Sequence, residues 1–353
     1  MTTEPLPAAA DVTHLTEVLR RSGVLDNGFV CAVTVESSRA TVLSRIIRLR
    51  LTYEGAGSQA PASLILKTGL PGRIGGGWNG GRREVAFYNQ VAAAMLARLV
   101  PGCFEAAFDE DTQAWHLLLE DLTESHVVPS AWPLPPAMEA CKAIVSARAR
   151  FHAAWWDDPR LGTSVGTWLD NEAMAGNRRR FADMFAGFVD RVGDILPSDR
   201  RALYERWLDA EPRLLARYRS RRHLTIVQCD AHVWNCFLPR VGGDDVRLFD
   251  WDSWELGIAA GDLANMIALH WYPDRRQRME RPLLDHYHAV LAAHGVTGYD
   301  RRALDEDYRL SVLWHITVPV WQEANKIPPW IWWNNLEHIL LAVDDLGCRD
   351  LLT

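Results

Sequence analysis

Long hydrophobic runs are missing from this 353-residue sequence, since no apolar stretch reaches the roughly 18 residues that would span a bilayer. The first residues lack the basic and apolar segments of a signal peptide, so we expect a cytoplasmic protein without membrane partners. The six cysteines are scattered with no Cys-x-x-Cys pair, which argues against a disulfide framework or a zinc site built on them. A basic excess is absent too: 38 Lys and Arg against 45 Asp and Glu give a net charge of −7, which argues against nucleic-acid binding.

What is present indicates a globular chain of two lobes. Hydrophobic residues make up 48% and charged residues 24%, and the length suits two domains. In the first 121 residues, several segments alternate apolar and polar residues as strands do, and one long segment has helical periodicity. This pattern predicts an antiparallel sheet with a helix. The expected elements are a helix over 11–21, strands over 42–53 and 64–67, a helix over 82–99, and a hairpin of 104–108 with 114–119.

Helical periodicity dominates from residue 122 to the end. A strand-rich island interrupts it, with strands expected over 224–228, 236–238 and 246–250. The sequence therefore predicts an α+β fold with a sheet lobe over 1–121 and a mainly helical lobe over 122–353. The expected helices cover 137–156, 171–193, 199–220, 261–272, 281–294, 301–324 and 330–346.

The island carries the most informative polar residues. Asp230 ends a short strand, Asn235 follows five positions later, and Asp250 ends the next apolar strand. Asp230 is a candidate proton acceptor, while Asn235 and Asp250 offer the oxygen ligands that Mg²⁺ prefers. Protein kinases use this arrangement of a catalytic-loop Asp, an Asn five residues on, and a strand-end Asp.

Two features earlier in the sequence fit the same kinase arrangement of site residues. Lys67 ends an apolar strand and Glu84 lies on the next helix, as in the kinase pair that orients the nucleotide phosphates. Either residue alone is more often a strand-edge lysine or a solvated glutamate, but their order before Asp230 and Asn235 favours the functional interpretation. The apolar segment 115–122 ends the sheet lobe, where a kinase presents backbone groups to adenine; an ordinary core strand is the alternative.

These residues resemble the aminoglycoside phosphotransferase and choline kinase superfamily, and most closely its ecdysteroid kinase-like branch with the bacterial relatives of that branch. The superfamily pattern His-Gly-Asp-x-His-x-x-Asn corresponds to 228–235, its Asp-Phe/Trp-Asp/Glu to 250–252, and its Gly-x4-Asp-Leu-Ala to 257–264. The resemblance spans nearly the whole chain. It implies a bilobal protein-kinase-like fold, with a nucleotide-binding lobe over 1–121 and a catalytic and acceptor-binding lobe over 122–353.

The resemblance also implies a role for each candidate site residue. ATP and Mg²⁺ would be the cofactors, and Asp262 would brace the catalytic loop. The roles are Asp230 as catalytic base, Asn235 and Asp250 on Mg²⁺, Lys67 with its partner Glu84 on the ATP phosphates, Ser37 and Ser38 in a phosphate-covering turn over 36–39, and Glu120 and Leu122 in the segment beside the nucleotide.

The sequence departs from the superfamily at the residues before the base. Gln228-Cys229 replaces the usual His-Gly, and a Gly there would permit a positive φ or close packing. We expect the loop to keep its shape because Cys is small. His232 is expected to be a structural histidine bonded to backbone, and His152 a satisfied core histidine. The glycines over 72–81 suit either a flap over the nucleotide or a functionless solvated loop.

The function implied is transfer of the γ-phosphoryl group of ATP to a hydroxyl of a small molecule. The alternative is a catalytically inactive kinase fold that binds a nucleotide or metabolite. A protein kinase is disfavoured because the glycine-loop pattern and an Ala-Pro-Glu segment are absent. Most tryptophans of the second half are expected in the core, yet their number favours an acceptor with an apolar or aromatic-stacking surface over a polyamine sugar; those concerned are Trp271, Trp314, Trp321, Trp330, Trp332 and Trp333.

Overall fold

The computed structural model describes residues 6–41, 43–55, 59–70, 80–95 and 97–353. The chain forms two compact units, the first made of Met1–Val127 with Phe237–Ser253 and the second of Val128–Cys236 with Trp254–Thr353. The late segment Phe237–Ser253 thus belongs with the N-terminal residues, which the sequence patterns did not indicate. The division of roles between residues 1–121 and 122–353 stays a prediction.

The first unit is built on a five-stranded sheet in which every neighbouring pair is antiparallel. Its central strand β3 has the strongest apolar pattern and is flanked on both sides. Together with the helical second unit, this sheet confirms the predicted α+β kinase-like architecture. In spatial order the strands are β1 (Phe29–Ala40), β2 (Ser44–Glu54), β3 (Ser63–Gly69), β5 (Trp115–Glu120) and β4 (Cys103–Phe108).

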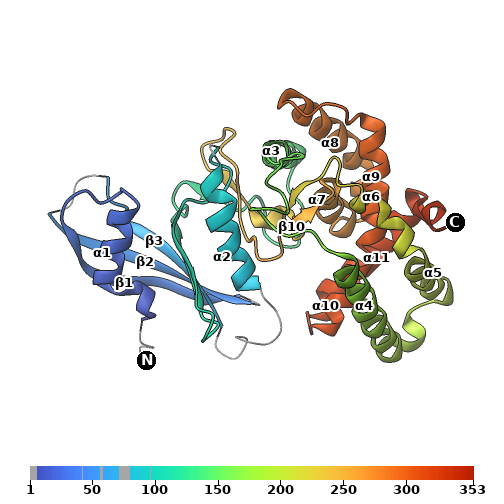
Figure 1. Cartoon of the computed structure of the whole chain (residues 1–353), viewed down its shortest axis with the longest axis horizontal. Coiled ribbons are helices and arrows are strands. Elements are labelled where there is room, and N and C mark those ends of the chain that lie inside the picture. The colour runs from blue at the N-terminus through green and yellow to red at the C-terminus, as the bar shows by residue number, and fades with distance from the viewer. Residues whose placement is uncertain (1–5, 42, 56–58, 71–79, 96) are drawn as a thin grey trace. The chain divides into compact units, whose positions relative to one another are not determined.

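Helices cover both faces of this sheet (Figure 1). On one face, α1 (Val12–Arg21) buries Leu15 and Leu19 in a core shared with Leu66 of β3. Lys67 is the next residue along β3 and points to the other face, because side chains alternate along a strand. There it meets Glu84 of α2 (Gly80–Gln90), so α1 and α2 lie on opposite faces.

Several predicted elements of the first unit are confirmed and two are wrong. The strands over 42–53 and 64–67 and the hairpin correspond to β2, β3 and the β4–β5 pair. The turn expected over 36–39 lies instead within β1, where Ser37 pairs with Arg48 and Ser38 with Ile47 of β2. The helix expected over 82–99 stops at Gln90 and is followed only by a 3₁₀ turn at Ala92–Ala94. Most of the glycine-rich stretch over 72–81 lies outside the described residues.

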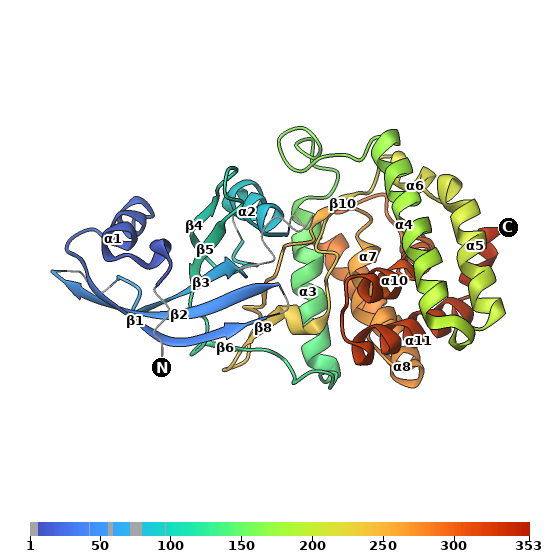
Figure 2. The same ribbon diagram turned by 90° about the horizontal axis from the view of Figure 1, so that it is seen from below.

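The second unit is mainly helical, as predicted, although two expected helices are each broken in two. The pattern over 199–220 divides between α5 and α6, and that over 301–324 between α9 and α10. Figure 2 shows α4 and α5 side by side. The helices are α3 (Met138–Ala154), α4 (Asn171–Val192), α5 (Ser198–Leu214), α6 (Ala216–Arg219), α7 (Ala260–Leu263), α8 (Pro273–Ala293), α9 (Arg301–Trp314), α10 (Thr317–Ala324) and α11 (Pro329–Asp345), with a π-helical turn at Ala264–Leu269.

Short strands hold the loops that carry the polar residues of the island. In the second unit β7 (Thr225–Val227) pairs with β10 (Glu255–Gly257), and Asp230 follows β7. A three-stranded sheet has β8 (Cys236–Pro239) between β6 (His126–Val127) and β9 (Arg247–Leu248), and Asp250 follows β9. Across the described residues, no helix combines the length and apolar character needed to cross a membrane.

Candidate active site

A buried lysine lies between two carboxylates in the first unit. The ammonium of Lys67 donates to Glu84 Oε1 at 2.8 Å and to Asp250 Oδ1 at 2.6 Å. Lys67 and Glu84 are buried, whereas the Asp250 side chain is 35% exposed. Burial alone would lower the pKa of Lys67, but the charges of Asp250 and Glu84 outweigh it and raise the pKa. The lysine is therefore held as a fixed positive charge.

The segment after β9 is fastened to α2, which fixes Asp250 beside Lys67. The Trp251 indole stacks on the Phe87 ring with 4.0 Å between ring centroids and 7° between ring planes. Both side chains are fully buried. Asp250 itself has a positive φ of 67°, a backbone conformation that Asp tolerates better than most residues. Three residues that the sequence places far apart are thus brought together.

The loop after β7 pairs the two polar residues of the second unit. The Asn235 side-chain amide donates to the backbone oxygen of Asp230 at 2.9 Å and to Asp230 Oδ2 at 3.2 Å. Asn235 is buried, while the Asp230 side chain is 46% exposed. Because the amide nitrogen faces Asp230, Oδ1 is the atom of Asn235 that can serve as a ligand. An amide oxygen of this kind suits a hard cation such as Mg²⁺, and the role predicted for Asn235 and Asp250 on Mg²⁺ stays a prediction.

A buried carboxylate braces this loop from beneath, as predicted for Asp262. Its Oδ2 accepts the backbone N–H of Gln228 and its Oδ1 that of Cys229, both at 3.0 Å. Burial alone would raise the pKa of Asp262, but Arg148 and His152 lower it well below its usual range. Asp262 therefore stays ionised and holds the two residues that precede Asp230.

Arg148 of α3 was missed by sequence reasoning. Its guanidinium donates to Asp262 Oδ2 at 2.8 Å, to Gln228 Oε1 at 3.0 Å and to the backbone oxygen of Ala231 at 3.0 Å. Gln228, in the place of the usual His, thus accepts from Arg148 in the fully buried brace. The available signal was an arginine one helical turn before His152 on an otherwise apolar helix face. His152 bonds Asp262 and Tyr287, as expected of a satisfied core histidine.

Cys229 adopts a backbone conformation that favours glycine. Its φ is 68°, in the left-handed region that costs a side-chain-bearing residue roughly 1–2 kcal/mol. The hydrogen bond from its N–H to Asp262 keeps the loop in this conformation. The loop is therefore held by Asp262 in a conformation that is locally strained at Cys229.

We expect Cys229→Gly to raise the free energy of unfolding by up to about 1 kcal/mol, because relief of strain exceeds the extra chain entropy of Gly. Cys31→Gly is the matched control, since Cys31 lies in β1 and Gly within a strand costs roughly 0.5–1 kcal/mol. Urea unfolding of both variants measures the difference. An equal loss of stability in the two variants would contradict strain at Cys229.

His232 differs from its expected role. Its Nε2 lies 3.5 Å from Asp230 Oδ2, and its Nδ1 is buried with no hydrogen-bond partner among the described residues. The expectation of a bond to backbone is therefore wrong. The ring contacts Trp234 and His270, with centroids 5.5 Å and 5.3 Å away. Burial lowers the pKa of His270 to about 3, so the His270 ring that contacts His232 is uncharged near neutral pH.

The remaining predicted site residues lie elsewhere in the first unit. Ser37 and Ser38 are exposed on β1. Glu120 ends β5, where its Oε2 accepts the Gly102 N–H at 3.1 Å, and Leu122 is buried two residues later. Their roles beside a nucleotide stay predictions.

A pocket of about 350 Å³ opens within the second unit next to the loop that follows β7. Cys229, the residue before Asp230, lines it together with Gly257, Ile258 and residues of α4, α5, α9 and α10. Its walls are mostly apolar, and Glu211 and Glu255 contribute carboxylates. This volume is in the range of small-molecule binding sites. Of the tryptophans named from the sequence, Trp314 lines this pocket, Trp271 is buried in the core and Trp330 is 63% exposed. The kind of acceptor surface expected from these tryptophans stays a prediction.

The sheet with its Lys–Glu pair and the Asp-x4-Asn loop define a protein of the kinase-like fold. The ecdysteroid kinase-like family matches residues 40–295, more than half of the sequence, so the chain belongs to this family. No curated protein matches the sequence.

Solved structures share the fold at low sequence identity. An ethanolamine kinase from Plasmodium vivax superposes with a TM-score of 0.60 at 12% identity, over 96% of this chain and 89% of that one. A microcompartment-associated aminopropanol kinase gives 0.56 at 13% identity, over 96% and 95%. A choline kinase from Streptococcus pneumoniae gives 0.52 at 12% identity, over 94% and 98%.

Proposed function

We propose that this protein transfers the γ-phosphoryl group of ATP to a hydroxyl group of a small molecule. The observation that carries the proposal is the pocket whose wall includes Cys229, immediately before Asp230. A carboxylate beside a cavity of this size can orient an acceptor hydroxyl and take its proton. We expect the reaction in the cytoplasm, with no nucleic-acid or membrane partner.

Each polar residue has a distinct task in this proposal. Asp230 orients and deprotonates the acceptor, and its contact with Asn235 fixes the carboxylate. Lys67, aligned by Glu84, binds the phosphates of the nucleotide. Asn235 and Asp250 would hold Mg²⁺, which neutralises phosphate charge when bound. Asp262 is a positioning residue, because it acts through the backbone of the loop and not on the substrate.

The pocket favours an acceptor with an apolar body. Its walls are lined by residues such as Met174, Ile258 and Trp314, which suit apolar or ring-stacking contact. The similar folds include kinases named for ethanolamine, choline and aminopropanol, each with one amine. Glu211 and Glu255 would balance a single amine, but a polyamine sugar needs a carboxylate partner for each ammonium.

Mg²⁺-ATP should stabilise the protein against heat, and Asp250→Ala should lose the metal-dependent part of this gain. A ligand at 100 times its dissociation constant adds about 2.7 kcal/mol to the free energy of unfolding. Asp111→Ala, at an exposed hairpin tip, is the control and should keep the gain. The heat stabilisation is measured by thermal melts with and without Mg²⁺-ATP. Phosphoryl transfer is then measured as ADP release with amino alcohols, sterol-like alcohols, sugars and aminoglycosides as acceptors.

Each outcome of this experiment has a definite meaning. Turnover of an amino alcohol or apolar alcohol supports the proposed function. A heat shift with no turnover across the panel supports the alternative, an inactive fold that binds a nucleotide. Saturable phosphorylation of an aminoglycoside alone contradicts the proposed acceptor class, and the absence of any shift contradicts nucleotide binding.

A further inference from the structure

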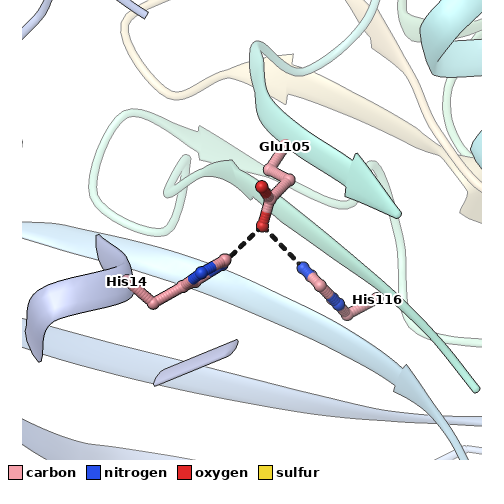
Figure 3. Close-up of side chains that lie close together, drawn as sticks. All are labelled: His14, Glu105 and His116. Atoms are coloured by element: carbon pink, nitrogen blue, oxygen red, sulfur yellow. Dashed lines mark hydrogen bonds and ion pairs between the residues drawn. The ribbon is translucent and has the colours of Figure 1, made fainter. Parts of the chain in front are cut away.

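Two histidines and a glutamate converge in the first unit, away from the residues assigned to the proposed reaction. His14 Nε2 lies 2.6 Å from Glu105 Oε2, and His116 Nε2 lies 2.8 Å from the same oxygen. Figure 3 shows both imidazoles pointing at this carboxylate from different elements. All three candidate ligand atoms lie within 4.8 Å of one another.

The local structure fixes each of these side chains. Asp11 caps α1 by accepting the N–H groups of Thr13 and His14, which sets the first turn of the helix. Glu105 and His116 are diagonal neighbours on one face of the β4–β5 hairpin, since Glu105 pairs with Leu118 and His116 lies two residues before it. The residues thus come from three elements that the sheet core already holds in place.

The carboxylate of Glu105 is held through both of its oxygens. Arg21 Nη2 donates to the other oxygen, Oε1, at 2.6 Å. The side chains of His14, Glu105 and His116 are 35%, 14% and 21% exposed, so solvent reaches the group. Arg21 orients the Glu105 carboxylate through Oε1, so that Oε2 faces the imidazoles of His14 and His116.

We propose that His14, Glu105 and His116 bind a divalent transition-metal ion, with Zn²⁺ as the best fit. Two imidazole nitrogens and one carboxylate oxygen are a known Zn²⁺ donor set, and water completes four-coordination. Bonds of about 2.0–2.1 Å place the ligand atoms of a tetrahedral site roughly 3.4 Å apart. The 2.6 and 2.8 Å contacts need to open by roughly 0.8 and 0.6 Å, which small side-chain rotations supply.

Metal binding would join α1 to the sheet on the face opposite Lys67. His116 pairs with Thr68 of β3, the residue after Lys67, but alternation turns the Lys67 side chain to the α2 face. The site is therefore separate from the groups assigned to the nucleotide. Its occupancy consolidates the layer between α1 and the sheet without adding a reactive group to the proposed reaction.

The test is a titration of the chelator-treated full chain with ZnCl2, followed by calorimetry and, with Co²⁺, by visible absorption. We expect one equivalent to bind and a fourfold-coordinate Co²⁺ spectrum. His116→Gln and Glu105→Gln should each weaken binding by more than about 100-fold, since even outer-shell partners cost 10–100-fold. His294→Gln, at the exposed histidine that caps the C-terminal end of α8, should bind as the unmodified chain does.

Excess Mg²⁺ separates this site from the one proposed for the nucleotide. Mg²⁺ prefers oxygen ligands, so it should not displace Zn²⁺ from two imidazoles. Circular dichroism of each variant shows whether it is folded, and His14→Gln offers a third ligand change if another variant unfolds. Absence of equimolar binding, displacement by Mg²⁺, or undiminished binding by the folded His14 and His116 variants would overturn the proposal.

Discussion

Asp230→Asn should lower kcat by about 10²–10⁴-fold with the best acceptor found, because general-base contributions are of this size. The substitution removes the proton acceptor but keeps an oxygen for the amide of Asn235, which bonds Asp230 in the folded chain. The loop should therefore keep its shape. ADP release at saturating ATP measures the effect, and the Mg²⁺-ATP heat shift should persist in the variant.

The matched control for this variant is Asp274→Asn. Asp274 is an exposed carboxylate of α8 with an ion pair to Arg278, far from any assigned role. Its turnover should equal that of the unmodified protein. If Asp230→Asn retains turnover within about tenfold, below the range of general-base effects, the base is another group. His232, whose Nε2 lies 3.5 Å from Asp230, would then be the next candidate.

Arg148→Met should lower the free energy of unfolding by about 3–5 kcal/mol, as is usual when one partner of a buried ion pair is removed. Asp262 is fully buried and would lose the guanidinium that offsets its desolvation. The same change removes the bond to Gln228 Oε1, so the loop before Asp230 loosens. Urea unfolding followed by far-ultraviolet circular dichroism measures the loss.

An exposed ion pair provides the control for the buried ion pair between Arg148 and Asp262. Arg278 and Asp274 form an ion pair with side chains 74% and 76% exposed, so Arg278→Met should change stability by less than about 1 kcal/mol. The double change Arg148→Met with Asp262→Asn should cost less than the sum of the single changes, because it strands no charge. Equal small losses in Arg148→Met and Arg278→Met would show that Arg148 does not support the brace.

The sequence predicted the parts of the fold whose apolar residues recur at a clear period. The strand over 42–53 alternates from Ile47 to Tyr53, and it is confirmed as β2. β1 was missed because it is an edge strand that is exposed along most of its length, so its second half carries little apolar alternation. That omission led directly to the wrong turn over 36–39. Edge strands receive their structure from pairing with a neighbour, and this information is not local.

The residues of the candidate site also fall into those that the sequence predicted and those that it did not. Spacing along the chain indicated Lys67 with Glu84, and Asp230 with Asn235, and the structure brings each pair into contact. Arg148 reaches Gln228 and Asp262 across 80 and 114 positions of sequence. Its place one helical turn before His152 on an apolar helix face marks it as unusual, but this local pattern does not indicate which distant residues it bonds.

The assignment of Phe237–Ser253 to the first unit has a consequence for the order of folding during synthesis. A ribosome delivers β1 through β6 long before it delivers Asp250, one of the two carboxylates that neutralise the buried ammonium of Lys67. Until Asp250 has been made, Glu84 is the only one of these two carboxylates that can neutralise the Lys67 ammonium. The smaller sheet is also incomplete at that stage, because β8 and β9 have not yet been synthesised. The first unit therefore begins to emerge before the second, but it is completed only after the first half of the helical unit has been made. A polypeptide that ends at Val127 lacks part of the first unit.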